Sequence, residues 1–271
     1  MFTGRLLRWL RKFPPSRGPG ASRPARIPDA AWNTAFSALP FLSRLSAEEE
    51  RRLKRLAEGF LSEKEFAGAG GFEITDAICV SIAMQACLPI LNLGMAYYDG
   101  WIGIVVYPDE FVVPRVTLDE SGVIHEYDDI ASGEAWEGGP VLVSWKDAKM
   151  AGEGYNVVIH EFAHKLDMRD GRIDGIPPLP PDIPAKEWEE TLLSAFDEFC
   201  AFPRPEFDDD EGYGFDEYAA TNLEEFFAVM SEAFFEEAKR LRDEFPALYA
   251  IFSRFYRQDP ARAAGSAMFR G

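Results

Sequence analysis

Histidine and cysteine are both scarce in this chain of 271 residues, which contains three of each. Cys79, Cys87 and Cys200 are odd in number, and no two of them form a C-x-x-C pair. A disulfide framework and a cysteine-ligated zinc site are therefore both unexpected. Unpaired thiols in a chain that has enough apolar residues for a core are typical of a reducing compartment, so we expect a cytoplasmic location.

The chain also lacks a long apolar run and, over most of its length, an excess of basic residues. No stretch approaches the roughly 18 apolar residues of a membrane-spanning helix, so we expect no membrane span. Residues 1–26 hold seven Arg or Lys and no acid, whereas the rest of the chain holds 21 basic and 46 acidic residues. An acidic body argues against direct nucleic-acid binding, which needs a positive face for the phosphates.

Residues 1–28 are predicted to be a basic tail and a Pro/Gly-rich linker, disordered, ahead of one folded domain at 29–271. Phe2 to Phe13 is basic and amphipathic, and its Arg and Lys residues interrupt the apolar run that a secretion signal requires. This pattern fits a poorly ordered tail or a helix lying on an anionic membrane surface. Pro14 to Pro28 is rich in Pro, Gly, Ser and Arg, as flexible linkers are.

Two of the three histidines, His160 and His164, are four residues apart, and Glu161 directly follows the first. Residues four apart share one face of a helix, with Cβ atoms about 5–6 Å from each other, so both imidazoles can reach one zinc ion. Glu161 lies one step around the helix and can face a water molecule beside the metal. The surrounding sequence is apolar, as a buried site requires. We interpret the stretch as the H-E-x-x-H arrangement of zinc hydrolases, not as a fortuitous pair on a surface helix.

A catalytic zinc site needs a third protein ligand from elsewhere in the chain. The position six residues after His164, where metzincins carry a histidine, is Asp170. The remaining histidine, His125, lies in a predicted strand and is a weak candidate. Carboxylates are better candidates: Glu225 and Glu232 are seven residues apart on a predicted helix and share an apolar face. The residue pattern alone does not choose between these two glutamates.

Two further acids are predicted to have supporting roles. Glu224 occupies the last position of a predicted capping box that begins at Thr221, which makes its role structural. Asp167 lies three residues after the second motif histidine and seven after the first, so it shares their face. Asp167 is our first choice for a residue that orients an imidazole, and Glu232 is the second.

The middle of the chain predicts a small, largely antiparallel or mixed sheet, since short β-branched and aromatic segments alternate there with Gly or Pro. Helices are predicted before and after it, so the expected fold class is α+β. The predicted strands are 101–107, 111–113, 123–127 and 141–145. The predicted helices begin at the Ser46 capping box, at Thr75 or Asp76, and at Thr221, or cover 155–168, 186–202 and 246–256. Loops are predicted at 170–184 and 206–217.

Four segments of the chain, in order, carry a family resemblance. They are Y-D-G-W-x-G (98–103), H-E-Y-D-D-I-A-S-G-E-A-W (125–136), H-E-F-A-H-K-L-D-M-R (160–169) and Y-A-A-T-N-L-E-E-F-F-A-V-M-S-E-A-F-F (218–235). With these segments the chain resembles the Mlc titration factor A family, bacterial zinc peptidases of the gluzincin kind, over roughly residues 39–260. Lys165 departs from the uncharged residue that zinc peptidases generally carry after the second histidine, and this departure is usual in the family.

The resemblance implies a zincin-like metallopeptidase domain at 29–271, related to the catalytic core of anthrax lethal factor. It implies one zinc ion per chain held by His160, His164 and Glu225, because the family's third ligand is the Glu seven residues after the Tyr of Y-A-A. That tyrosine is Tyr218, a candidate hydrogen-bond donor to the oxyanion, with Glu161 as the general base.

The resemblance also implies what the protein binds and cleaves. Family members are described as peptidases of the aminopeptidase type that act on a peptide or protein substrate. They are also described as binding the glucose repressor Mlc and so regulating sugar-uptake genes. The alternative is a non-catalytic protein that sequesters the repressor and merely retains a zinc site.

Overall fold

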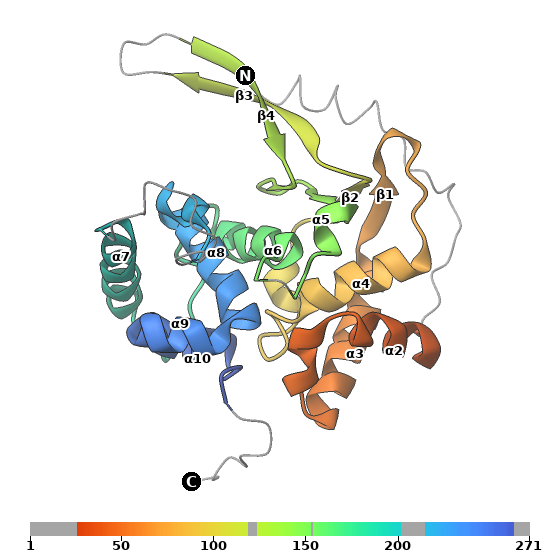
Figure 1. Cartoon of the computed structure of the whole chain (residues 1–271), viewed down its shortest axis with the longest axis horizontal. Helices are drawn as coiled ribbons and strands as arrows, with labels where there is room; N and C mark the ends of the chain where they lie inside the picture. The colour runs from red at the N-terminus through yellow and green to blue at the C-terminus, as the bar shows by residue number, and fades with distance from the viewer. Residues whose placement is uncertain (1–25, 119–123, 153, 202–214, 263–271) are drawn as a thin grey trace, which may run out of the picture.

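The structure is a computed structural model that describes residues 26–118, 124–152, 154–201 and 215–262. It has a mixed α+β fold in which a small sheet packs among many helices (Figure 1), as the sequence predicted. The predicted tail and most of the predicted linker and acidic loop lie outside the described residues, so these assignments and the domain boundary stay predictions. The side chains of residues 115–126 are also outside the description.

Local capping chemistry starts the two longest helices of the N-terminal part. The hydroxyl of Ser46 accepts a hydrogen bond from the Glu49 N–H, and the Glu49 carboxylate accepts one from the Ser46 N–H at 2.8 Å. The Thr75 hydroxyl accepts from the Ile78 N–H. Both predicted helix starts are thereby confirmed. The helices of this part are α2 (Asp29–Ser37), α3 (Ala47–Glu63) and α4 (Asp76–Cys87), with 3-10 turns η1 (Pro40–Arg44), η2 (Ala69–Gly71) and η3 (Met95–Tyr98).

A four-stranded mixed sheet has the order β1-β2-β6-β5. The first three of these strands are parallel, and β5 pairs antiparallel with β6 and forms an edge of the sheet. The sequence predicted a mixed sheet but not β1 or β5, which are too short, at four and three residues, for a readable pattern. The strands are β1 (Glu65–Gly68), β2 (Gly103–Tyr107), β5 (Gly133–Ala135) and β6 (Val141–Ser144).

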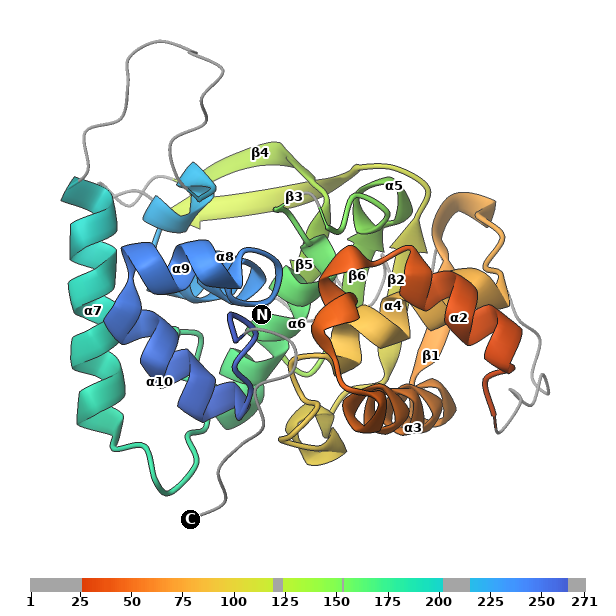
Figure 2. The ribbon, with the colours of Figure 1, turned by 60° about the horizontal axis from the view of Figure 1, so that its bottom comes forward.

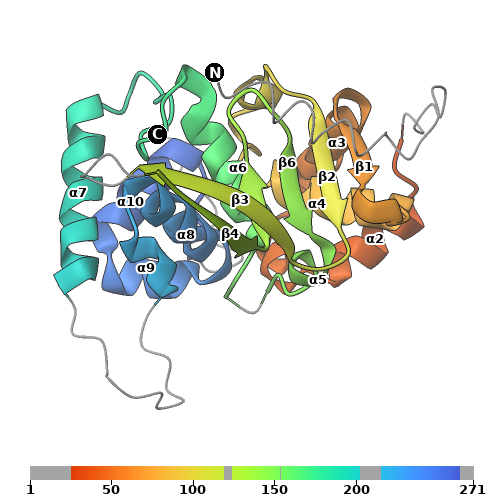
Figure 3. The ribbon, with the colours of Figure 1, turned by 90° about the horizontal axis from the view of Figure 1, so that it is seen from above.

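A separate antiparallel hairpin is formed by β3 (Phe111–Leu118) and β4 (Ile124–Ala131). Both strands are longer than the sequence predicted. Figures 1 and 3 show the hairpin extending from the sheet over the middle of the molecule toward the C-terminal helices. The chain passes from β4 into β5 through Ser132 alone, so the end of the hairpin and the edge strand are continuous.

The helix α6 (Val157–Asp167) carries the H-E-x-x-H stretch through the middle of the fold, and all eleven of its residues are buried. Figure 2 shows the C-terminal helices gathered on the side of α6 away from α2 and α3. These helices are α7 (Ala185–Ala201), α8 (Leu223–Glu236), α9 (Ala238–Glu244) and α10 (Pro246–Tyr256), and the remaining short elements are α5 (Trp145–Ala148), η4 (Met168–Asp170) and η5 (Glu217–Ala220).

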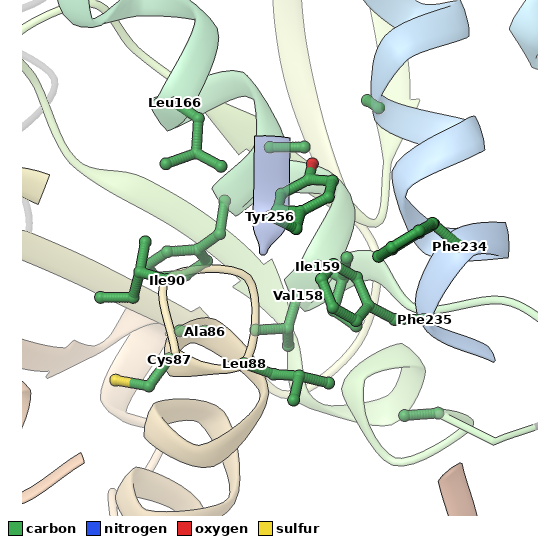
Figure 4. Close-up of a cluster of buried hydrophobic side chains, with 14 of the residues drawn as sticks. Ala86, Cys87, Leu88, Ile90, Val158, Ile159, Leu166, Phe234, Phe235 and Tyr256 are labelled. Atoms are coloured by element: carbon green, nitrogen blue, oxygen red, sulfur yellow. The ribbon is translucent and has the colours of Figure 1, made fainter. Parts of the chain in front are cut away.

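Apolar packing fixes α6 against α8. Figure 4 shows Val158 and Ile159 of α6 beside Phe234 and Phe235 of α8, with Tyr256 of α10 next to them. The four apolar side chains are almost completely excluded from solvent, which stabilises the pair of helices by about 1.5–3 kcal/mol per side chain. Apolar packing therefore contributes to holding α6 against α8.

The predicted start of α8 is wrong by one residue. Asn222, not Thr221, is the N-cap, and its side-chain oxygen accepts from the Glu225 N–H at 2.8 Å. Thr221 instead ends η5, where its N–H bonds the Tyr218 carbonyl. Asparagine is at least as strong an N-cap as threonine, which explains the shift. Glu224 consequently has no capping-box role.

Among the described helices, none combines the length and the apolar composition that a crossing of the bilayer needs. The predicted cytoplasmic location stays a prediction.

Candidate metal centre

The first turn of α6 is organised by Asn156. Its side-chain oxygen caps the helix by accepting from the Ile159 N–H at 2.9 Å. From this start the helix places His160 and His164 on one face, with ring centroids 4.8 Å apart. Both imidazoles are buried, at 8% and 7% exposure. The helical placement of the two histidines that the spacing predicted is therefore present in the structure.

Three ligand atoms converge between α6 and α8. Oε2 of Glu225 lies 3.1 Å from Nε2 of His160 and 3.2 Å from Nε2 of His164, and the two Nε2 atoms are 3.2 Å apart. A tetrahedral zinc ion with bonds of about 2.0–2.1 Å would hold its ligands roughly 3.3–3.4 Å apart, so this donor set fits the ion. These three residues form a group able to hold a metal.

Glu232 binds the other side of His160. Its Oε1 lies 2.7 Å from Nδ1 of that imidazole, and its Oε2 accepts from the Asn156 N–H at 2.6 Å. The side chain is 3% exposed. One carboxylate thus holds both the imidazole and the start of α6. The structure separates the two glutamates that the residue pattern left equal, because Glu225 faces Nε2 and Glu232 faces Nδ1.

Asp167 lies near the second histidine but is not hydrogen-bonded to it. Its Oδ2 accepts from the Gly175 N–H at 2.9 Å. Its Oδ1 and Nδ1 of His164 are both buried without a hydrogen-bond partner. Burial raises the pKa of Asp167 to about 7. The predicted contact from Asp167 to an imidazole is therefore not formed, although Oδ1 of Asp167 and Nδ1 of His164 both lack another partner.

Glu161 faces the edge strand β5. The carboxylate is 5% exposed, and burial raises its pKa to about 8. A Cβ atom placed on Gly133 would fall 2.3 Å from Oε1 of Glu161, so the strand approaches the carboxylate as closely as its backbone allows. Both residues line a cavity of about 540 Å³ that also contains the two histidines and Glu225. Glu161 therefore shares one cavity with the three convergent residues.

Tyr218 belongs to η5 and enters the same cavity from the side of α8. Its hydroxyl donates to Oε1 of Glu225 at 3.1 Å, and its ring centroid is 6.1 Å from that of His160. The side chain is 49% exposed, so it is not a packed core tyrosine. The half-exposed phenol therefore lies beside the convergent ligand atoms.

Sequence reasoning missed several residues of the site. Gly133 and Tyr155 line the cavity, and Glu224, expected to be structural, lines it too. Asn156 was identifiable, since an Asn directly before an apolar helix is an N-cap signal. Gly133 reaches the site only through the tertiary packing of β5 against α6, and no local sequence pattern predicts this contact. His125 lies in β4 opposite Thr117, and its side chain is outside the described ones.

Comparison with known proteins gives one family and a set of close relatives. The sequence model of the family described as glucose-regulated metallo-peptidase M90 matches residues 14–257. The chain is 40% identical over 240 residues to proteins named Mlc titration factor A from Salmonella schwarzengrund, Salmonella typhi and Salmonella typhimurium. Each alignment covers 86% of this chain and 88% of the relative.

Proposed function

The chain belongs to the M90 family of glucose-regulated metallo-peptidases, and on this premise we propose that it is a zinc-dependent peptidase of the gluzincin kind. The observation that carries the proposal is the convergence of Nε2 of His160, Nε2 of His164 and Oε2 of Glu225 within 3.2 Å of one another. The helix α6 beside the edge strand β5 supports a zincin-like domain.

His160, His164 and Glu225 would hold one zinc ion. When bound there, zinc would polarise the carbonyl of the scissile bond and lower the pKa of a water molecule. Glu232 orients His160 through Nδ1. For His164 the corresponding partner would be Asp167: the two side chains are not hydrogen-bonded, but Nδ1 of the ring and Oδ1 of Asp167 are both buried without a hydrogen-bond partner.

Glu161 would act as the general base and acid. Its carboxylate takes a proton from the attacking water and then delivers it to the amine that leaves. Burial raises the pKa of Glu161 above its ordinary value, which makes its carboxylate a stronger base toward the proton of the water than an exposed glutamate would be. The close approach of Gly133 leaves no room for a side chain between β5 and this carboxylate.

Tyr218 and β5 would bind the substrate. The phenol of Tyr218 would donate a hydrogen bond to the oxyanion that forms from the scissile carbonyl, and its contact with Oε1 of Glu225 supports this role. The edge strand β5 can pair with an extended peptide, since its outer edge is not used by the four-stranded sheet. The aminopeptidase type of activity stays part of the proposal and rests on the family resemblance.

The test compares wild type with Glu161→Gln in a peptide hydrolysis assay, with zinc content measured on the same samples. Glutamine keeps the size of the side chain but cannot take up the proton. We expect Glu161→Gln to bind zinc as wild type does and to lose at least about 10²-fold in kcat. Equal rates in the two proteins would remove Glu161 from the mechanism, and hydrolysis by neither would remove the peptidase function.

A second function follows from the name of the relatives. Proteins 40% identical to this chain over 86% of its length are called Mlc titration factor A, and we propose that this chain also binds a repressor of the Mlc kind. Binding measurements with purified repressor and with both wild type and Glu161→Gln separate the two functions. If both proteins bind the repressor and neither cleaves a peptide, the chain is a repressor-binding protein with a retained metal site.

A further inference from the structure

Lys165 directly follows the second histidine and is buried, at 3% exposure. Its ammonium group donates to two backbone carbonyls, those of Trp136 at 2.5 Å and Gly139 at 2.9 Å. Both carbonyls belong to the turn that joins β5 to β6. A charged side chain of α6 therefore binds the hairpin that contains the edge strand.

A second buried lysine makes a similar set of contacts elsewhere. Lys64 is 5% exposed and donates to the carbonyls of Tyr98 and Trp101 at 2.5 and 2.7 Å. Both ammonium groups also face the Trp101 ring, with Nζ of Lys64 at 4.0 Å and Nζ of Lys165 at 4.8 Å from its centroid. The two lysines thus share a ring but hold different segments. Lys64 binds the chain before β2, and Lys165 binds the β5–β6 turn.

The contacts of α6 with β5 occur at two points. Glu161 and Lys165 are four residues apart and share one face of the helix. Glu161 meets Gly133, the first residue of β5, and Lys165 meets the turn that follows the last residue of β5. The strand therefore lies close to α6 at its first residue, and the turn after its last residue is hydrogen-bonded to the same helix.

Burying an ammonium group in this space is energetically unfavourable, because its charge is removed from water. Methionine would fill a similar volume without that cost. What methionine cannot do is donate hydrogen bonds to the carbonyls of Trp136 and Gly139. The hydrogen bonds to the β5–β6 turn thus explain why a lysine occupies this buried position.

We propose that Lys165 is a positioning residue that holds β5 at the distance from Glu161 that an extended peptide substrate requires. Its effect on substrate rests on the proposed peptidase function, whereas its effect on the turn does not. Two measurements separate these parts.

The first measurement is amide hydrogen exchange in Lys165→Met, with Lys64→Met as the matched control. Within the turn, the Trp136 N–H donates to the Pro140 carbonyl and the Gly139 N–H to the Trp136 carbonyl. We expect these two amides to exchange at least about tenfold faster in Lys165→Met, because the turn loses two charge-assisted hydrogen bonds. Lys64→Met should leave their exchange unchanged. If Lys165→Met is not recovered folded, Lys165→Gln, which keeps one donor group, should show a smaller increase of the same kind.

The second measurement compares two substrates. For a peptide long enough to pair with β5, Lys165→Met should raise KM about tenfold, whereas kcat for a short amino-acid anilide should change less than about threefold. Lys165→Arg, which can still donate to both carbonyls, should restore KM. The control Lys64→Met should keep the wild-type KM.

The proposal is overturned if the Trp136 and Gly139 amides exchange alike in wild type and Lys165→Met, or if Lys64→Met changes them equally. It is also overturned if the turn opens but KM for the long peptide stays unchanged. Absence of hydrolysis by wild type, together with faster exchange in Lys165→Met, would instead remove the peptidase function and keep the link between Lys165 and the turn.

Discussion

Gly133 lies so close to Glu161 that a Cβ atom added to it would fall 2.3 Å from Oε1 and 2.6 Å from Cγ of the glutamate. Contact distances of this kind do not occur between real side chains, so any larger residue at position 133 must displace the carboxylate or the strand. The position of β5 at residue 133 and the position of the Glu161 carboxylate therefore constrain each other.

Replacing Gly133 by alanine should lower peptidase activity while leaving the metal in place. The added methyl group displaces the Glu161 carboxylate, and a displacement of about 1 Å is enough for a loss of the order of 10²-fold in rate. The three atoms nearest to the new methyl group all belong to Glu161, and none belongs to a proposed zinc ligand. Measurements of kcat and zinc content on Gly133→Ala should show the first reduced and the second unchanged.

Gly59 provides a matched control for this substitution. It lies inside α3, and a Cβ atom at this position meets nothing within 4 Å. Gly59→Ala should retain wild-type activity and gain about 0.5–1 kcal/mol in the free energy of unfolding. Full activity in Gly133→Ala would show that the carboxylate does not need its observed position.

Two adjacent glutamates of α8 should differ in their effect on metal binding. Glu225→Gln should lose most of the bound zinc, because an amide oxygen is a weaker ligand than a carboxylate. Glu224→Gln should keep it, since Glu224 lines the cavity but is not one of the three convergent residues. Zinc content after dialysis gives the comparison. A chelator should then lower the Tm of Glu224→Gln and leave that of Glu225→Gln unchanged.

Glu232→Gln should weaken zinc binding without abolishing it. The carboxylate accepts from Nδ1 of His160 at 2.7 Å and so fixes the orientation in which Nε2 faces the metal. Loss of such a partner lowers metal affinity by about 10–100-fold. Competition with a chelator of known affinity measures the change. An unaltered zinc Kd would mean that the contact of Glu232 with His160 does not affect metal binding, and that its contact with the Asn156 N–H is its main role.

The stability of the metal-free protein should depend on pH through Asp167. Burial raises the pKa of this carboxyl group from 3.8 to about 7. Between those values the folded protein holds a proton that the unfolded chain has released, so the contribution of Asp167 to the free energy of unfolding falls as pH rises. Above about pH 7 the loss is complete.

Asp167→Asn removes this titration and should flatten the dependence between about pH 4 and pH 7. Urea unfolding of metal-free wild type and variant across that range gives the two slopes. Asp170→Asn is the control, since Asp170 is exposed and three residues away. Parallel curves for wild type and Asp167→Asn would show that the carboxyl group titrates alike in the folded and unfolded protein.

The sequence predicted those parts of the site that depend on spacing along one helix. His160 and His164 share a face of α6 because residues four apart must do so. The same rule left Glu225 and Glu232 equal, because both point from one face of α8 toward α6. Their roles differ only because the packed core sets which turn of α8 lies opposite each nitrogen of the imidazole. The family resemblance chose Glu225, and local pattern alone could not.

The missed features are tertiary. The strand β5 is three residues long and exists because β6 offers it a partner. Gly133 matters through its approach to α6, and the two bonds of Lys165 cross 26 and 29 residues of chain. The capping error at Thr221 has a local cause, since two good capping residues stood side by side and Asn222 was the stronger.

The central claim is that His160, His164 and Glu225 together bind zinc. A crystal structure of the protein soaked in zinc, with anomalous scattering recorded at the zinc edge, tests it most directly. We predict one strong peak between α6 and α8, with both Nε2 atoms and a Glu225 oxygen at about 2.0–2.2 Å. A zinc ion elsewhere, or one more than about 3 Å from the Glu225 carboxylate, would contradict the claim.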